Sequence, residues 1–299
     1  MTGPTRDTTA GRVYNDLGNL ARSQGRSTDA LMIDYVLERF LFRLAASPLG
    51  GRHFVLKGGL LLSQFGARRM TRDIDILGRE FSAGDAEIIR RIAGIAATAV
   101  DDGVAFDTQT LKTTPIRENN DYGGLRLTMA ATIARARLKV QLDVSIGDPV
   151  TPEPQTIDYP QTLAAEPFTL YGYPLATVIA EKLTTAIALG DFSTRDRDYA
   201  DLYRVITLND LDGAELTRAL TATAAHRGIT LQPLSASITD IATRRQSSYT
   251  AWRLRQAAAS ASYPDSFAEV VQLVISFFDP LITSKTATRR WTAASRAWT

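Results

Sequence analysis

The feature that most constrains this chain is a short apolar run broken by two glycines. Residues 54–56 predict a buried strand, Gly58 and Gly59 end it, and residues 60–65 predict the first turns of a helix. Backbone N–H groups and a helix N-terminus meet at such a turn, and together they suit a phosphate group. The order of these elements therefore predicts a strand–turn–helix unit that binds phosphate.

Two aspartates follow a few residues later. Asp73 and Asp75 flank Ile74 in a segment that predicts a second strand. Alternate residues of a strand point to the same face, so both carboxylates should lie on one face while Ile74 and Ile76 enter the core. Oxygen ligands at this spacing suit Mg²⁺, which would also offset the repulsion between the two charges. The alternative is a core strand with two surface aspartates, and the ordered glycine pair, helix and aspartates favour the metal site.

A third acid lies on another predicted strand. Residues 136–146 alternate between apolar and polar, which places Asp143 on the polar face of a strand expected in the same sheet. The polar positions of this strand are Lys139, Gln141, Asp143 and Ser145. A solvated strand acid is the alternative interpretation of Asp143, and Asp148 is a weaker candidate for the third acid.

The composition narrows the classes of protein to which this chain can belong. The 299-residue chain carries 34 basic and 32 acidic residues, so its net charge of +2 neither demands nor forbids nucleic acid. Cysteine is absent, which excludes disulfides and thiolate chemistry, and the 2 histidines lie too far apart in sequence to favour a zinc site. The apolar runs are too short to span a bilayer. We therefore expect a cytoplasmic protein with no membrane contact.

Proline usage divides the chain. Six of the 12 prolines fall within residues 148–174, which predicts an irregular connection with a short edge strand near 168–171. We predict a catalytic domain over 1–150, a connection over 151–173, and a mainly helical domain over 174–299. The expected class is α+β, with a mixed sheet and flanking helices before the helical domain.

These motifs resemble motif I of the polymerase-β-like nucleotidyltransferases. The sequence from Leu56 to Leu60, with the segment from Arg69 to Asp75, is similar to the AbiEii-type family, which includes the MenT-like toxins of toxin–antitoxin systems. Gly59 stands where the wider superfamily has serine, a change that AbiEii-type members share. The resemblance implies a polymerase-β-like fold and the activity of a metal-dependent nucleotidyltransferase toxin.

The second half carries two further matching segments. Lys182 lies in a Glu-Lys-Leu helix and resembles the motif II lysine of the family, and Asp198 takes the place of the motif IV aspartate. Asp201 lies one turn further on, and its role stays open. Without the resemblance, Lys182 and Asp198 would be interpreted as solvated helix residues.

The resemblance also implies roles. Asp73, Asp75 and Asp143 would hold Mg²⁺, and Gly58 and Gly59 would let the backbone approach the phosphates. Lys182 would neutralise the triphosphate, and Asp198 would position Lys182 or bind ribose or base. The remaining candidates for nucleotide contact are Lys57 and Arg72, of which Arg72 is the weaker.

The resemblance implies partners as well. MenT-like toxins add pyrimidine nucleotides to the 3′ end of tRNA, so we expect a nucleoside triphosphate such as CTP, tRNA and a cognate antitoxin. Transfer to a small hydroxylated molecule or to protein stays an alternative, as does a non-catalytic binding module. Residues 242–299 hold eight Lys/Arg against three Asp/Glu, which favours RNA docking there. Trp252 and the arginines near it form either a basic helix face with an aromatic residue or an ordinary solvated helix face, and we expect residues 289–298 in a mobile basic tail.

Overall fold

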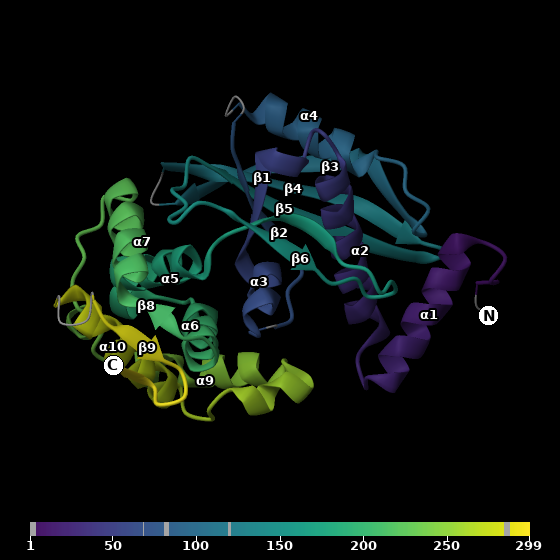
Figure 1. Ribbon diagram of the computed structural model, residues 1–299. Coiled ribbons are helices and arrows are strands. Elements are labelled where there is room, and N and C mark those ends of the chain that lie inside the picture. Colours follow the sequence, from purple (N-terminus) through teal and green to yellow (C-terminus); the bar gives the residue numbers. More distant parts are fainter. Residues whose placement is uncertain (1–3, 68, 81–83, 119–120, 284–287) are drawn as a thin grey trace. The chain divides into compact units, whose positions relative to one another are not determined.

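The computed structural model describes residues 4–67, 69–80, 84–118, 121–283 and 288–299, which form two compact units (Figure 1). The first unit consists of Met1–Leu60, Thr71–Gly147 and Thr156–Gly172. The second consists of Leu61–Met70, Asp148–Gln155 and Tyr173–Thr299. Both units therefore draw on segments that are separated in the sequence.

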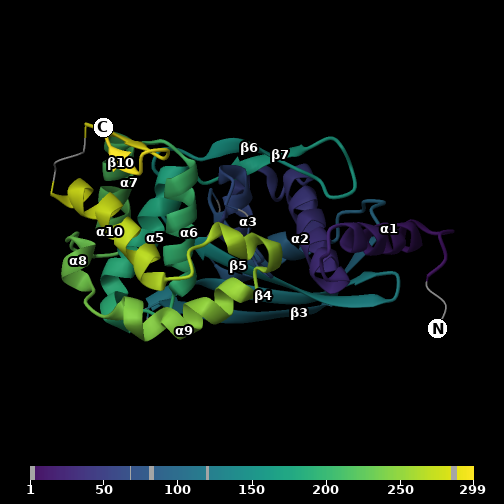
Figure 2. The ribbon, with the colours of Figure 1, turned by 90° about the horizontal axis from the view of Figure 1, so that it is seen from below.

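A seven-stranded mixed sheet organises the first unit, in the order β3-β4-β5-β2-β1-β7-β6. Antiparallel pairing joins β3, β4 and β5, which lie side by side in Figure 2, and also β1 to β2. The pairs β2–β5 and β1–β7 are parallel. The strands are β1 (Phe54–Lys57), β2 (Ile74–Gly78), β3 (Val104–Glu118), β4 (Asp121–Ile133), β5 (Ala136–Ile146), β6 (Gln155–Tyr159) and β7 (Phe168–Gly172).

Helices α1 (Thr9–Ser23), α2 (Thr28–Ala46) and α4 (Asp85–Ala96) pack against this sheet, with α2 in contact with both of the others. Phe40 of α2 meets the ring of Phe106 on β3 edge to face. Phe106 is aligned with Ala131 on β4 and then with Leu138 on β5, so these residues mark the core face of the sheet. The opposite face of β5 carries the polar residues that its alternation predicts.

The second unit is mainly helical and closes with a small sheet. Its apolar core contains Leu183, Val205 and Phe277, all fully buried. The three-stranded sheet has the order β10-β9-β8. The elements are η2 (Leu62–Phe65), α5 (Leu175–Leu189), η3 (Gly190–Phe192), α6 (Asp196–Leu208), β8 (Leu211–Asp212), α7 (Gly213–His226), α8 (Leu234–Ser237), α9 (Ile241–Leu254), η4 (Ala257–Ser262), α10 (Phe267–Ile282), β9 (Arg290–Thr292) and β10 (Ala297–Trp298). The α+β class and the helical second half are thereby confirmed.

The proline-rich stretch is more regular than predicted. Strands β6 and β7 lie within it, and β7 pairs with β1 inside the sheet, so the expectation of an edge strand at 168–171 was wrong. Pro160 and Pro167 fall between the two strands rather than inside them, where each would remove a ladder hydrogen bond.

The expected mobile tail was also wrong for its described part. Trp291 is only 1% exposed, and its indole N–H donates to the carbonyl of Ile206 at 2.7 Å. Trp298 donates to the carbonyl of Phe277. Trp252 is likewise buried and so does not lie on a basic face. Trp291 and Trp298 pack their large rings together and give each indole N–H a polar partner, which outweighs the effect of the basic residues beside them in the sequence.

None of the described helices combines the length and the apolar character that a membrane crossing would need.

Candidate active site

An acidic cluster forms where β2 lies beside β5. The parallel register of these strands aligns Asp75 with Asp143, and Asp73 precedes β2 by one residue. One carboxylate oxygen from each of the three residues lies within 4.8 Å of the other two. All three side chains are half-buried, so the cluster is accessible from solvent. The structure thus brings together the three acids that the sequence analysis grouped.

The turn after β1 leaves room for this cluster. Gly58 has a φ of +67°, a conformation that favours glycine, and a Cβ added there would lie 1.9 Å from Oδ2 of Asp75. Lys57, the last residue of β1, is aligned with Asp75. Gly58 and Gly59 are the first two residues of the short helix α3 (Gly58–Leu61). Gly58 is therefore required for the position of Asp75 as well as for the turn itself.

Arg126 on β4 completes the cluster, and the sequence analysis missed it. Its guanidinium donates to both carboxylate oxygens of Asp143, from Nε at 2.8 Å and from Nη2 at 2.6 Å. The hydrogen bond to Asp143 and the charges of all three aspartates raise the pKa of Arg126 despite some burial. A basic residue between the buried Leu125 and Leu127 was the available signal, but only the β4–β5 register identifies its partner.

Asp73 has a partner of its own in the loop before β2. The hydroxyl of Thr71 donates to Oδ1 of Asp73 at 2.5 Å. This bond orients the carboxylate at a position where the chain has not yet entered the strand.

Lys182 lies in a buried ionic network of the second unit. Its ammonium donates to Asp198 at 2.7 Å and to Asp201 at 2.8 Å. Arg195 contacts the other oxygen of Asp198, and Arg69 contacts Asp201 at 2.8 Å. Helices α5 and α6 supply the lysine and the two aspartates, and Asp201 is only 1% exposed. The described part of this network joins Lys182, Arg195 and Arg69 to Asp198 and Asp201.

In this network, ion pairing has a larger effect on the pKa values than burial has. Burial alone would lower the pKa of Lys182, but Asp198 and Asp201 raise it above its usual value. Burial alone would raise the pKa of Asp198, yet Lys182 and Arg195 lower it to about 2. Both groups are therefore charged at neutral pH.

Two other candidates have different surroundings. Arg72 is exposed and lines a hollow in the first unit. Asp148, the alternative third acid, lies 3.9 Å from Nε2 of His226 in the second unit. Among the described residues, the acidic group suited to a metal contains Asp143 and not Asp148.

Comparison with protein families identifies the family to which this chain belongs. The model of the AbiEii nucleotidyltransferase toxins of type IV toxin–antitoxin systems matches residues 39–273, well over half of the chain. The chain belongs to this family. It is therefore an AbiEii-type nucleotidyltransferase, and the resemblance described above is confirmed. The family also implies a nucleotide substrate and a cognate antitoxin.

One solved structure supports the fold of this AbiEii-type chain, and a second is a more distant likeness. MenT4, a nucleotidyltransferase toxin from Mycobacterium tuberculosis H37Rv, is 14% identical, with a TM-score of 0.52 over 90% of this chain and 98% of its own. JHP933 from Helicobacter pylori is 15% identical, with a TM-score of 0.47 over 87% of this chain and 94% of its own. A comparison with curated proteins gave no significant match.

Proposed function

We propose that this AbiEii-type enzyme transfers a nucleotide, preferably the pyrimidine nucleotide of CTP, to the 3′ end of tRNA. Such transfer would block aminoacylation and translation in the cytoplasm until a cognate antitoxin neutralises the enzyme. The observation that carries the proposal is the convergence of Asp73, Asp75 and Asp143 beside the turn at Gly58. The choice of tRNA and CTP rests on the similarity to MenT-like toxins.

The acidic cluster fits Mg²⁺ in both chemistry and spacing. Carboxylate oxygens are its preferred protein ligands, and two oxygens on opposite sides of one ion lie about 4.2 Å apart. The three aspartate oxygens lie within 4.8 Å of one another, so small side-chain rotations would bring them into range. Bound Mg²⁺ would offset the negative charge that develops on the phosphate and on the attacking and leaving oxygens.

The chain's own residues supply the remaining roles in this proposal. Gly58 and Gly59 let the backbone approach the phosphates, and Lys57 adds a contact. Asp143 accepts the proton of the acceptor hydroxyl, and the two hydrogen bonds from Arg126 hold its carboxylate in place. Lys182 offers its positive charge to the triphosphate, while Asp198 and Asp201 fix the ammonium.

The test is transfer of labelled nucleotide by the purified chain. Each of the four labelled nucleoside triphosphates is incubated with total tRNA and Mg²⁺, and the RNA, protein and small-molecule fractions are counted. We expect label in tRNA, strongest from CTP, and a loss of at least about 100-fold in Asp75→Ala. Asp101→Ala, an exposed acid in a loop of the same unit, is the matched control.

The outcomes separate the alternatives. Label confined to protein or to small molecules would replace tRNA as the acceptor while retaining the nucleotidyltransferase chemistry. Full activity of Asp75→Ala at saturating Mg²⁺ would contradict the assignment of the acidic cluster.

A further inference from the structure

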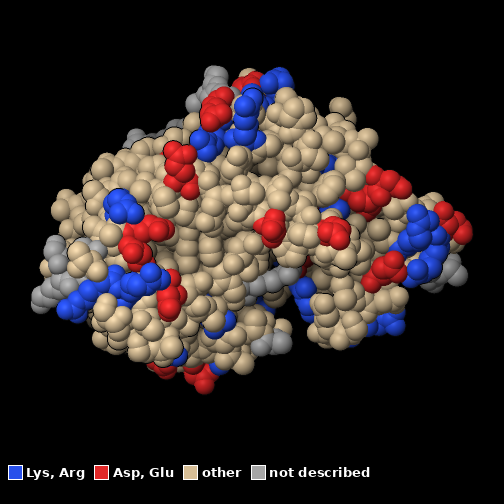
Figure 3. Space-filling model, in the orientation of Figure 1, with Lys and Arg blue, Asp and Glu red and all other residues tan. Residues whose placement is uncertain are grey.

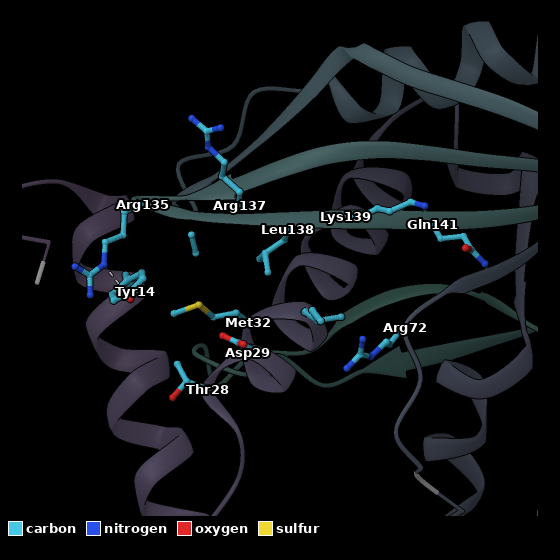
Figure 4. A pocket seen from close by; sticks show the side chains of 12 residues that line it. Tyr14, Thr28, Asp29, Met32, Arg72, Arg135, Arg137, Leu138, Lys139 and Gln141 are labelled. Atoms are coloured by element: carbon cyan, nitrogen blue, oxygen red, sulfur yellow. Dashed lines mark hydrogen bonds between the residues drawn. The ribbon is translucent and has the colours of Figure 1, made fainter. Parts of the chain in front are cut away.

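A hollow of about 690 Å³ lies along the first half of β5 in the first unit (Figure 4). Helix α1 and the start of α2 form one wall, and β5 forms another. Arg72, directly before Asp73, lines it as well. We name it the basic hollow, after the four cations that line it: Arg72, Arg135, Arg137 and Lys139.

The strand pairing explains why a hollow exists there. Strand β2 begins at Ile74 and is aligned with β5 only from Leu142 onward. Residues 136–141 of β5 therefore extend past the end of β2, and the chain before Ile74 turns away. This step in the sheet edge leaves space beside Lys139 and Gln141.

The charge of the basic hollow is largely uncompensated. Arg72, Arg137 and Lys139 are exposed, and no carboxylate of the described residues forms an ion pair with them. Arg135 lies over the ring of Tyr14, and Asp29 is the acid of the lining.

Helix α4 shows the opposite arrangement. Basic and acidic side chains lie next to one another over this helix in Figure 3, and Glu87 pairs with both Arg90 and Arg91. Cations over α4 are thus neutralised by neighbours, whereas Arg72, Arg137 and Lys139 of the hollow have no ion pair among the described residues.

The basic hollow leads towards the acidic cluster. Lys139, Gln141 and Asp143 occupy alternate positions of β5 and so share one face. At about 3.3 Å per residue, Lys139 lies about 13 Å from Asp143, the length of about four stacked nucleotides at 3.4 Å each. Lys139 therefore lies on the same strand face as the point where an acceptor hydroxyl must arrive, with the neutral Gln141 between them.

We propose that the basic hollow binds the sugar–phosphate backbone of the nucleic-acid acceptor and directs its 3′ end to Asp143. This proposal rests on the proposed function, because it requires an RNA acceptor. It places the docking surface on the sheet of the first unit rather than on the C-terminal helices. Binding of a protein partner would not require cations on the strand face that carries Asp143. An RNA strand that delivers its terminal hydroxyl to Asp143 does require a contact for its backbone on that face.

The experiment measures binding of fluorescently labelled tRNA to the full chain by anisotropy over a series of salt concentrations. Arg137→Glu and Lys139→Glu are compared with Arg52→Glu. Arg52 is exposed in the same unit and lies in η1 (Gly51–His53), near the other end of β5, because Phe54 is aligned with Gly78 and Gly78 with Ile146. Each test variant should bind tRNA about tenfold more weakly, with a salt slope lower by about one phosphate contact. The affinity for CTP with Mg²⁺ should stay unchanged in all three.

Several outcomes would overturn the assignment. If Arg137→Glu and Lys139→Glu bind tRNA as tightly as Arg52→Glu, the basic hollow is not the tRNA-binding surface. A parent chain that does not bind tRNA would exclude the proposal as well. A parallel loss of CTP affinity would make the hollow a triphosphate site. Loss of antitoxin binding with intact tRNA binding would make it a protein interface. If the parent binds tRNA through the hollow but transfers no nucleotide to it, the proposed function fails while the docking surface stands.

Discussion

Arg126 shows how a single residue can set the charge of the acidic cluster. It satisfies both oxygens of Asp143 and adds a positive charge close to the three aspartates. A divalent cation that binds there must act against this charge. The affinity of the cluster for metal is therefore set in part by a side chain that is not itself a ligand.

We predict that Arg126→Gln binds a divalent cation more tightly than the parent in the absence of nucleotide. Removing one positive charge at the cluster should strengthen binding about tenfold, or about 1.4 kcal/mol. Mn²⁺ titration followed by electron paramagnetic resonance measures the dissociation constant, with Arg52→Gln as the control. Equal or weaker Mn²⁺ binding by Arg126→Gln would show that Arg126 does not oppose the metal.

Lys182 gives a second prediction at this scale. We expect Lys182→Ala to lower the free energy of unfolding by about 3 kcal/mol, because Asp198 and Asp201 stay buried with one cation fewer. It should also abolish most transfer activity, and Lys182→Arg should restore it only in part, since a guanidinium is wider than an ammonium. Urea unfolding and the transfer assay test both effects. Lys112→Ala, at an exposed position, should change neither, and a Lys182→Ala chain of parental stability would exclude a structural role for the network.

Helices α5 and α6 are joined by charge as well as by apolar packing, and this makes their contact sensitive to acid. The folded pKa of Asp198 is about 2, below its ordinary value of 3.8. The stabilisation is therefore complete above about pH 4 and is lost as the pH falls towards 2, because the unfolded chain takes up the proton first.

We predict that the parent loses about 2 kcal/mol of stability from this group between pH 5 and pH 2. Asp198→Asn should be less stable than the parent at pH 6, and the difference should shrink as the pH is lowered. Urea midpoints at a series of pH values measure it. A constant difference across the series would mean that Asp198 is not held ionised by the network.

The elements also show what could be predicted from the sequence. The alternation in β5 places Asp143 on the polar face of its strand because strand geometry is local, and the apolar spacing of α2 and α5 predicts those helices. Arg126 was missed because its partner depends on the register between two strands. Trp252 and Trp291 were assigned to the surface because basic neighbours surround them, whereas both are buried, Trp291 through partners distant in sequence. Local rules therefore predicted the acids, and tertiary contacts determined their surroundings.

At the scale of the whole molecule, the family membership predicts an effect on the host cell. Expression of the chain should arrest bacterial growth unless the cognate antitoxin is present, and Asp73→Ala should remove the arrest by disrupting the acidic cluster. An inducible strain scored for growth, with tRNA 3′ ends sequenced before and after induction, measures both. Normal growth with unaltered tRNA ends in a strain that makes folded protein would exclude toxicity through tRNA in that host.

The burial of Trp291 has a genetic consequence. Its ring packs against Phe277 and Trp298, and its indole binds the carbonyl of Ile206, so a copy that stops before codon 291 lacks part of the core of its second unit. Nonsense and frameshift mutations should then be as disabling late in the reading frame as early in it. Cells that escape the growth arrest should accordingly carry such lesions along the frame up to that codon, and not only around the codons for the three aspartates.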